Sequence, residues 1–207
     1  MVFPLLHNGP VYYFALLTRR KEVVFEQHDN YVKQSYRNRC IILGPNGTVA
    51  LTVPVKKNHG RKTPYRDVLV DNEKPWQRIH WKSLTSAYAA SPFFQYMSDE
   101  FRPYYEREIK YLIDLNAGLM NTILKFLNLN LSFRFSDSFT EIRGGRDPRE
   151  MIHPKKNPGS EDPLFSVMEY QQVFSERHGF QPNLSVLDLM FNMGSESKTL
   201  LEISFKT

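Results

Sequence analysis

Basic side chains occur at alternate positions in the segment 31–39, which contains Lys33, Arg37 and Arg39. If this segment is extended, its side chains point alternately to opposite faces. The three cations then share one face, and three polar side chains share the other, namely Gln34, Tyr36 and Asn38. Guanidinium groups two residues apart can each bind carboxylate or phosphate oxygens, whereas on an exposed edge strand the same charges would only block edge pairing. We favour the first interpretation and expect the segment to bind an anionic ligand.

A second basic segment runs from Lys56 to Arg66 and contains five lysine and arginine residues and no acidic residue. Such a run is either a solvated surface loop or an anion-binding loop. We include Lys56 among the candidate ligand contacts.

A histidine and a tyrosine share one face of a predicted helix that starts after Pro75. Helical spacing aligns His80 with Tyr88 and places Trp81 on a neighbouring row. His80 is a candidate general acid or base with Tyr88 beside it, and Trp81 is a candidate stacking surface. The alternative is that all three are core residues, because a histidine on an apolar helix face is often a hydrogen-bonded core residue.

Polar residues within apolar helices are further candidates for ligand binding. Asn116 lies inside the apolar stripe of a helix predicted over about 105–127, where a buried amide needs partners, so it is either part of a core network or a ligand contact. Asp188 and Asn192 share a helix face at i,i+4. They are candidate ligand contacts, but we favour end-capping for both, because Ser185-x-x-Asp188 fits a capping box and Asn192 precedes Gly194.

Several classes of site are absent from the sequence. The six histidines show no zinc-ligand spacing, there is one cysteine, and no phosphate-binding, dinucleotide or nucleophile-elbow motif is present. The tetrapeptide His7-Asn8-Gly9-Pro10 matches only the first half of a nucleotidyltransferase H-x-G-H motif. We therefore expect no protein-bound metal, and the sequence leaves the cofactor open.

Composition and patterning predict a globular α/β protein. Hydrophobic residues make up 41% of the chain and charged residues 24%, values that indicate a folded core. Short apolar segments predict strands near Val23–Phe25, 38–43, 49–53, 68–70 and 133–135, with a hairpin turn at Gly44-Pro45-Asn46-Gly47. We expect one layered domain over residues 1–207: a strand-rich mixed sheet with a hairpin (about 1–72), then packed helices (about 73–207) and an irregular loop (about 144–163).

The cysteine and the N-terminus indicate where the protein works. Cys40 lies in an apolar run and reads as a buried hydrophobe, which favours a reducing compartment. The first residues lack a basic region and are interrupted by Pro4, and no apolar stretch approaches the roughly 18 residues of a membrane span. We expect a cytoplasmic protein without a membrane span.

The ordered set of these segments resembles the WbqC-like proteins of bacteria. The matching segments recur in order over nearly the whole chain: Tyr31-x-Lys33-Gln34-x-Tyr36-Arg37-Asn38-Arg39, Leu51-x-Val53-Pro54-Val55, Trp76-x-x-x-His80-Trp81, Ala87-Tyr88, Ser91-Pro92-Phe93-Phe94 and the run Asn183 to Asn192. The chain departs from such proteins at residues 6–14, which replace a loop containing Tyr and Pro. The role of this N-terminal loop is therefore open.

The resemblance implies a place in surface-glycan synthesis. Such proteins are linked to O-antigen and other surface-polysaccharide gene clusters, and transfer of glycine or a similar group to a sugar has been suggested for them. We expect a transferase that moves an amino-acid or acyl group onto a sugar and binds a small anionic ligand, such as a nucleotide sugar or an activated amino acid or acyl donor. The alternatives are a non-catalytic binding protein for an anionic metabolite or nucleic acid, and a scaffold subunit. The oligomeric state is open.

Overall fold

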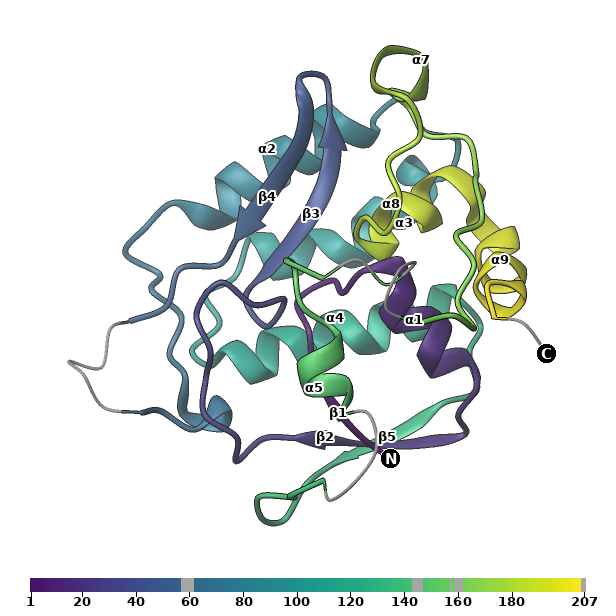
Figure 1. Ribbon diagram of the computed structural model, residues 1–207. Coiled ribbons are helices and arrows are strands. Elements are labelled where there is room, and N and C mark those ends of the chain that lie inside the picture. The colour runs from purple at the N-terminus through teal and green to yellow at the C-terminus, as the bar shows by residue number, and fades with distance from the viewer. Residues whose placement is uncertain (57–61, 143–146, 157, 159–161, 206–207) are drawn as a thin grey trace.

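A three-stranded parallel sheet forms one end of the molecule. The computed structural model describes residues 1–56, 62–142, 147–156, 158 and 162–205. β1 (Val2–Pro4) and β5 (Ser132–Phe135) flank the central strand β2 (Glu22–Glu26), and α1 (Val11–Thr18) crosses over between β1 and β2. Parallel neighbours need such a crossover. Figure 1 shows this sheet at one end of the molecule and the hairpin at the other.

The predicted hairpin is confirmed as a separate antiparallel sheet of two strands. β3 (Arg39–Gly44) pairs with β4 (Gly47–Thr52), and Gly47 has a φ of 104°, which glycine adopts readily. β3 pairs with β4 in a sheet of its own, and one of its carbonyl groups has a partner outside that sheet: the Ser185 N–H donates to the Ile41 oxygen over 2.7 Å. The α/β class is therefore confirmed, with two separate sheets in place of one mixed sheet.

The segment before Arg39 is not a strand. Residues 31–38 form turns, and Gln34 has a φ of 59°. Because a positive φ breaks the alternation of an extended chain, the predicted cationic row of Lys33, Arg37 and Arg39 does not form.

The central helices start close to the predicted positions, with one exception. α2 (Trp76–Tyr88) confirms the prediction and is followed by α3 (Phe94–Phe101) and the 3-10 turn η2 (Arg102–Tyr105). The helix expected from about 105 begins later, as α4 (Leu112–Phe126). Residues 110 and 111 pair instead with 68–70: the Val70 N–H donates to the Lys110 oxygen over 3.0 Å. The predicted strand 68–70 is thus reduced to isolated bridges.

The C-terminal part contains short helices. These are α5 (Pro148–Met151), α7 (Ser175–His178), α8 (Val186–Met193), the 3-10 turn η3 (Gly194–Glu196) and α9 (Ser197–Ile203). α5 lies inside the predicted irregular loop 144–163, whose residues 144–146, 157 and 159–161 lie outside the described residues. Residues 57–61 of the basic segment are likewise outside them, and Tyr65–Asp67 form the 3-10 turn η1.

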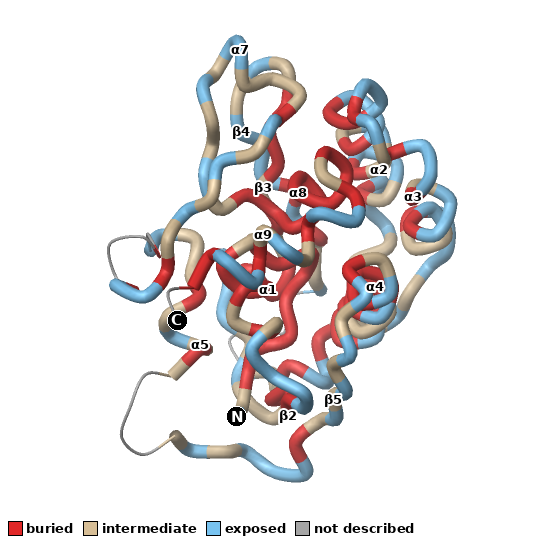
Figure 2. The backbone as a smooth tube through the Cα atoms, turned by 90° about the vertical axis from the view of Figure 1, so that its right-hand side faces the viewer, coloured by how far each residue is buried: buried red, intermediate tan, exposed pale blue. Residues whose placement is uncertain are grey.

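One hydrophobic core joins the described elements. Figure 2 shows buried chain concentrated around α1, α8 and β3, with exposed chain along the outer helices. Every residue from Phe3 to Pro10 is buried, so the chain after β1 runs through the interior. The expected N-terminal loop 6–14 therefore ends at Pro10, where α1 begins. This buried passage carries the candidate site.

Candidate functional site

The chain that follows β1 fixes a histidine and an asparagine at the centre of the molecule. The backbone N–H of His7 donates to the Tyr36 carbonyl over 2.8 Å, and the Ser185 hydroxyl donates to the Asn8 backbone carbonyl over 2.8 Å. Asn8 has a φ of 45°, which asparagine tolerates better than most residues. Both side chains are almost completely buried. Their backbone anchors hold them in one position.

Asn116 sets the tautomer of the His7 ring. Its Nδ2 donates to the Arg37 carbonyl oxygen over 2.7 Å and lies 2.6 Å from the Tyr65 hydroxyl, so its Oδ1 is the atom that faces His7 Nδ1, at 3.0 Å. An amide oxygen can only accept, and Nδ1 therefore carries the proton. His7 Nε2 is left with a lone pair and has no partner among the described residues.

His80 on α2 presents a second unpartnered ring nitrogen. Its ring centroid lies 5.9 Å from that of His7. A hydrogen bond between the His80 ring and the backbone of Thr52 raises the pKa of His80. A bond that raises this pKa stabilises the protonated ring, so the Thr52 backbone group is the acceptor. Nδ1 has no partner among the described residues. The proton therefore lies on Nε2, and Nδ1 carries the lone pair.

Both imidazoles are neutral at pH 7. Burial lowers the pKa of His7 to about 3, the repulsion that two protonated rings would exert lowers it further, and the hydrogen bond to Asn116 raises it. Burial also lowers the pKa of His80 to about 4, against the contribution from Thr52. Desolvation disfavours the charged imidazolium. Each ring is therefore a proton acceptor at neutral pH, which is the state that a general base requires.

Two further buried amides have side-chain oxygens that are free to accept a hydrogen bond. Asn8 Nδ2 donates to the Tyr105 hydroxyl over 3.1 Å and Asn38 Nδ2 donates to the Val53 carbonyl over 2.8 Å, while both Oδ1 atoms have no partner among the described residues. Burial raises the pKa of the nearby Cys40 thiol to about 12, opposed by Asn8, so Cys40 is not a thiolate nucleophile at neutral pH. Asn8 therefore adds an unpartnered acceptor next to His7.

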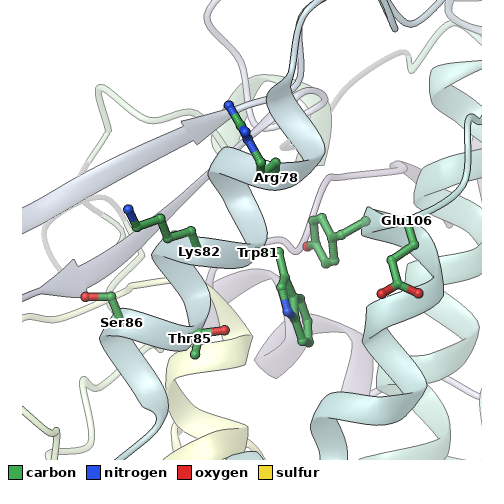
Figure 3. Close-up of a pocket in the computed structure, with 7 residues that line it drawn as sticks. Arg78, Trp81, Lys82, Thr85, Ser86 and Glu106 are labelled. Atoms are coloured by element: carbon green, nitrogen blue, oxygen red, sulfur yellow. The ribbon is translucent and has the colours of Figure 1, made fainter.

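An open surface pocket lies in front of this cluster. It has a volume of about 620 Å³, and it is lined by residues of α2 and η2 and the residue after η2, namely Arg78, Trp81, Lys82, Thr85, Ser86, Tyr105 and Glu106. The Trp81 and Tyr105 ring centroids are 5.8 Å apart, with 33° between the ring planes. Trp81 and Glu106 lie on opposite sides of the pocket (Figure 3).

Tyr105 connects the pocket to the buried cluster. Its ring lines the pocket, its hydroxyl accepts from Asn8, and its centroid lies 6.1 Å from that of His80. Because the hydroxyl is fully buried, its pKa is raised well above the ordinary value of tyrosine. Tyr105 is therefore a neutral wall between the pocket and His80.

Arg37 is engaged within the protein. Its guanidinium donates to the Asp29 carboxylate over 2.5 Å and to the Asn30 carbonyl over 3.0 Å, and it lies 5.1 Å from the centroid of the Tyr65 ring. The side chain is 5% exposed. Its charge is thus already compensated.

The other candidates from the same region lie apart from one another. Lys33 is exposed and Tyr36 is buried. Lys56 is 3.1 Å from Glu73, and both side chains are largely exposed, beside a separate pocket that is lined by residues including Leu69 and Lys110.

Tyr88, Asp188 and Asn192 form a second buried cluster. The Asp188 carboxylate accepts hydrogen bonds from three side chains at 2.8 to 2.9 Å, namely Tyr88, Tyr170 and Gln172. Burial raises the pKa of Asp188, and these three hydrogen bonds lower it. The capping prediction is half right: the Ser185 hydroxyl accepts from the Leu187 N–H, but Asp188 faces the interior. Asn192 donates to the Asp188 carbonyl over 2.8 Å.

Sequence reasoning missed four members of the buried site. Tyr65 and Tyr105 lie in 3-10 turns, and His7 and Asn8 lie in the passage after β1. The tetrapeptide His7-Asn8-Gly9-Pro10 was the available signal for His7 and Asn8, but it was set aside because it matches only half of the H-x-G-H motif. Within the described ranges, no group of three or more His, Cys, Asp or Glu side chains could hold a metal ion, and no helix has the length and apolarity to cross a membrane.

Comparison with known proteins identifies related sequences. The family model described as the WbqC-like protein family matches residues 10–155, a range that includes His80, Trp81 and Asn116. The chain is 27% identical over 216 aligned residues to "Uncharacterized protein Rv1507c" of Mycobacterium tuberculosis (strain ATCC 25618 / H37Rv), with 91% of each chain covered. No solved structure matches.

Proposed function

This chain belongs to the WbqC-like protein family, and we propose that it is a cytoplasmic transferase that moves an amino-acid or acyl group onto a sugar in surface-glycan assembly. The observation that carries the proposal is the neutral His80 ring, whose unpartnered Nδ1 lies behind an aromatic-walled pocket. A neutral imidazole with a free lone pair accepts the proton of an attacking hydroxyl or amino group.

The pocket offers the contacts that a sugar ring uses. The faces of Trp81 and Tyr105 provide apolar contact, and side chains around them can bond to hydroxyl groups, namely Thr85, Ser86 and Glu106. Arg78 and Lys82 add positive charge for an anionic donor such as a nucleotide sugar or an acyl phosphate. A ligand held here would meet both an aromatic surface and a proton acceptor.

The transfer step follows from this arrangement. The attacking oxygen or nitrogen forms a bond to the acyl carbon, and the proton it loses passes to His80 Nδ1. The bond to the leaving group breaks, and the leaving group departs with the electron pair. Because Tyr105 separates His80 from the pocket, the proposal requires the Tyr105 ring to swing aside when substrate binds.

A binding screen tests the pocket. Thermal unfolding of the purified chain is measured with nucleotide sugars, free sugars, amino acids and acyl phosphates, because a ligand of the folded state raises the melting temperature. A stabilising sugar ligand should lose its effect in Trp81→Leu and keep it in Tyr96→Leu, a control at an aromatic residue that is 79% exposed. Equal loss in both variants would argue against this pocket.

A turnover assay tests the chemistry. Stabilising donors and acceptors are combined, and the transferred product is measured by mass spectrometry. His80→Gln should lower the rate by about 10²–10⁴-fold, the usual contribution of a general base, and leave ligand binding intact. A rate within about twofold of the original would remove His80 from the mechanism. Binding without turnover would favour the non-catalytic alternative, and a steep salt dependence would favour nucleic acid as its ligand.

A further inference from the structure

Arg39 is a cation without a counter-ion at the start of β3. Its side chain makes no ion pair or hydrogen bond to any residue that the structure describes, and its Nε atom is buried. Arg39 as a residue is half-buried, whereas two arginines with side chains 5% and 9% exposed are paired, Arg37 with Asp29 and Arg149 with Asp147 at 2.6 Å. Removing a guanidinium nitrogen from water without an acceptor is unfavourable. The Arg39 environment therefore calls for an acceptor that the described protein does not supply.

The neighbours of Arg39 increase the positive charge. The pKa of His153 is lowered by burial and then by the charges of Lys155, Lys156 and Arg39. The three cations therefore lie close enough to His153 to interact with it electrostatically. No acidic residue contributes to this shift. Figure 1 shows the chain after α5 rising toward the lower end of β3, where Arg39 begins the strand.

The charge of Arg39 also acts on two tyrosines. Burial raises the pKa of Tyr31 and Tyr36 to about 12, and the charge of Arg39 acts on both in the opposite direction. Their hydroxyls remain protonated at neutral pH and can donate to an anion. A guanidinium, an imidazole N–H and phenolic hydroxyls together form a set of donors.

The imidazole of His153 has one nitrogen available as a donor. The Lys155 N–H donates to His153 Nδ1 over 3.2 Å, so the ring proton of the neutral form lies on Nε2. This ring therefore adds an N–H donor to the charge of Arg39.

We propose that Arg39, Tyr31, Tyr36 and the segment 153–155 bind a phosphate group of a small-molecule ligand. Arg39 provides a planar fork that matches phosphate oxygens, and Lys155 provides a second charge for a dianion. By strand alternation, Arg39 lies on the face of β3 opposite Cys40, whose thiol interacts with Asn8 of the histidine cluster. The site goes beyond the proposed transferase chemistry and does not depend on it.

Calorimetric titration of the full chain with inorganic phosphate and pyrophosphate, at constant ionic strength in chloride, tests the site. Pyrophosphate should bind, and Arg39→Gln should weaken its binding at least tenfold. Arg20→Gln, which removes the same charge from an exposed arginine, should bind as the original chain does. Acetate at the same concentration should bind much more weakly than phosphate. Titrations with uridine and with UDP are then compared, to distinguish binding of a phosphate carried by a nucleotide from binding of free phosphate.

Three outcomes overturn the proposal. These are the absence of pyrophosphate binding, equal binding by Arg39→Gln, and acetate binding as tight as that of phosphate. Circular dichroism checks that Arg39→Gln is folded. If it is not, Lys155→Gln decides, because Lys155 is exposed and its loss should weaken pyrophosphate binding several-fold without affecting the fold. Unchanged binding in Lys155→Gln then counts against the site. Transfer activity plays no part in these measurements, so the failure of either proposal is recognised separately.

Discussion

The buried histidines should make the protein lose stability in mild acid. Each has a folded-state pKa, about 3 for His7 and about 4 for His80, below its ordinary value of 6.5. Their stabilising contribution is complete above pH 6.5 and is lost as the pH falls toward the folded-state values, because the unfolded chain binds protons that the folded chain rejects. Between pH 7 and pH 5, each histidine should reduce the free energy of unfolding by about 2 kcal/mol, and the pair by about 4 kcal/mol.

The magnitude depends little on the folded-state pKa values. At pH 5 both rings are still neutral in the folded protein if their pKa values lie anywhere below about 4.5. The loss is then set by the unfolded chain, whose histidines titrate near 6.5. A His7 pKa one unit higher or lower would therefore give the same loss of stability.

Urea unfolding at pH 7 and pH 5 measures this effect. His80→Gln keeps a donor for the Thr52 acceptor, and His7→Asn keeps a donor for Asn116. Each variant should show a pH-dependent loss that is about 2 kcal/mol smaller than that of the original chain. Carboxyl groups titrate in all three proteins, so the difference between proteins isolates the histidines. Between pH 8 and pH 9, where neither imidazole titrates, the differences should be constant.

One result would refute the reasoning. If both variants lose as much stability on acidification as the original chain, the two rings are protonated in the folded state at pH 5. The cluster would then hold charged imidazoles, and the assignment of His80 as a neutral proton acceptor would fail with it.

Three substitutions test the surrounding contacts by urea unfolding at pH 7. Asn116→Leu leaves three buried partners unpaired, at about 1–3 kcal/mol each, so a loss below about 2 kcal/mol would contradict the network. Tyr88→Phe removes one donor to the buried Asp188 carboxylate and should cost about 1–3 kcal/mol; no loss would mean that Asp188 is protonated or solvated. Gly194→Ala should destabilise by at least about 1 kcal/mol, since Gly194 has a φ of 54° and a Cβ would lie 2.5 Å from the Phe93 ring; a neutral result would show that the turn relaxes.

Local patterns predicted the elements that depend on neighbours in the sequence. The helix at 76–88 follows from its periodicity, and the hairpin follows from the turn at Gly44–Gly47. Elsewhere the predicted boundaries were wrong, because hydrogen bonds between segments distant in the sequence set them. The helix expected from 105 starts at Leu112 because residues 110 and 111 are held by bonds to 68–70, and no local pattern encodes those bonds. The helix Val11–Thr18 is buried nearly all round, so it shows no amphipathic period.

The site was predictable only in part, because burial and pairing decide what a polar residue does. His80, Trp81 and Asn116 were identified as candidates from their helical positions. Arg37 and Arg39 have the same residue type and were treated alike, yet one is paired with Asp29 and the other has no counter-ion. The partners of Arg37, Asp29 and the Asn30 carbonyl, lie across the turn that contains Gln34, and strand alternation could not reveal them.

The segment 36–39 links the two candidate sites through its backbone and one side chain. The Tyr36 carbonyl anchors the His7 N–H, and the Arg37 carbonyl orients Asn116, which fixes the His7 tautomer. Arg39 then projects from the face of β3 opposite Cys40. Side-chain substitutions at 36 and 37 that preserve the backbone should therefore spare the histidine cluster, whereas a shift of the segment by ligand at Arg39 would move the acceptor of Asn116. A phosphate-dependent change in the NMR signals of the His7 ring would demonstrate that coupling, and unchanged signals at saturating phosphate would exclude it.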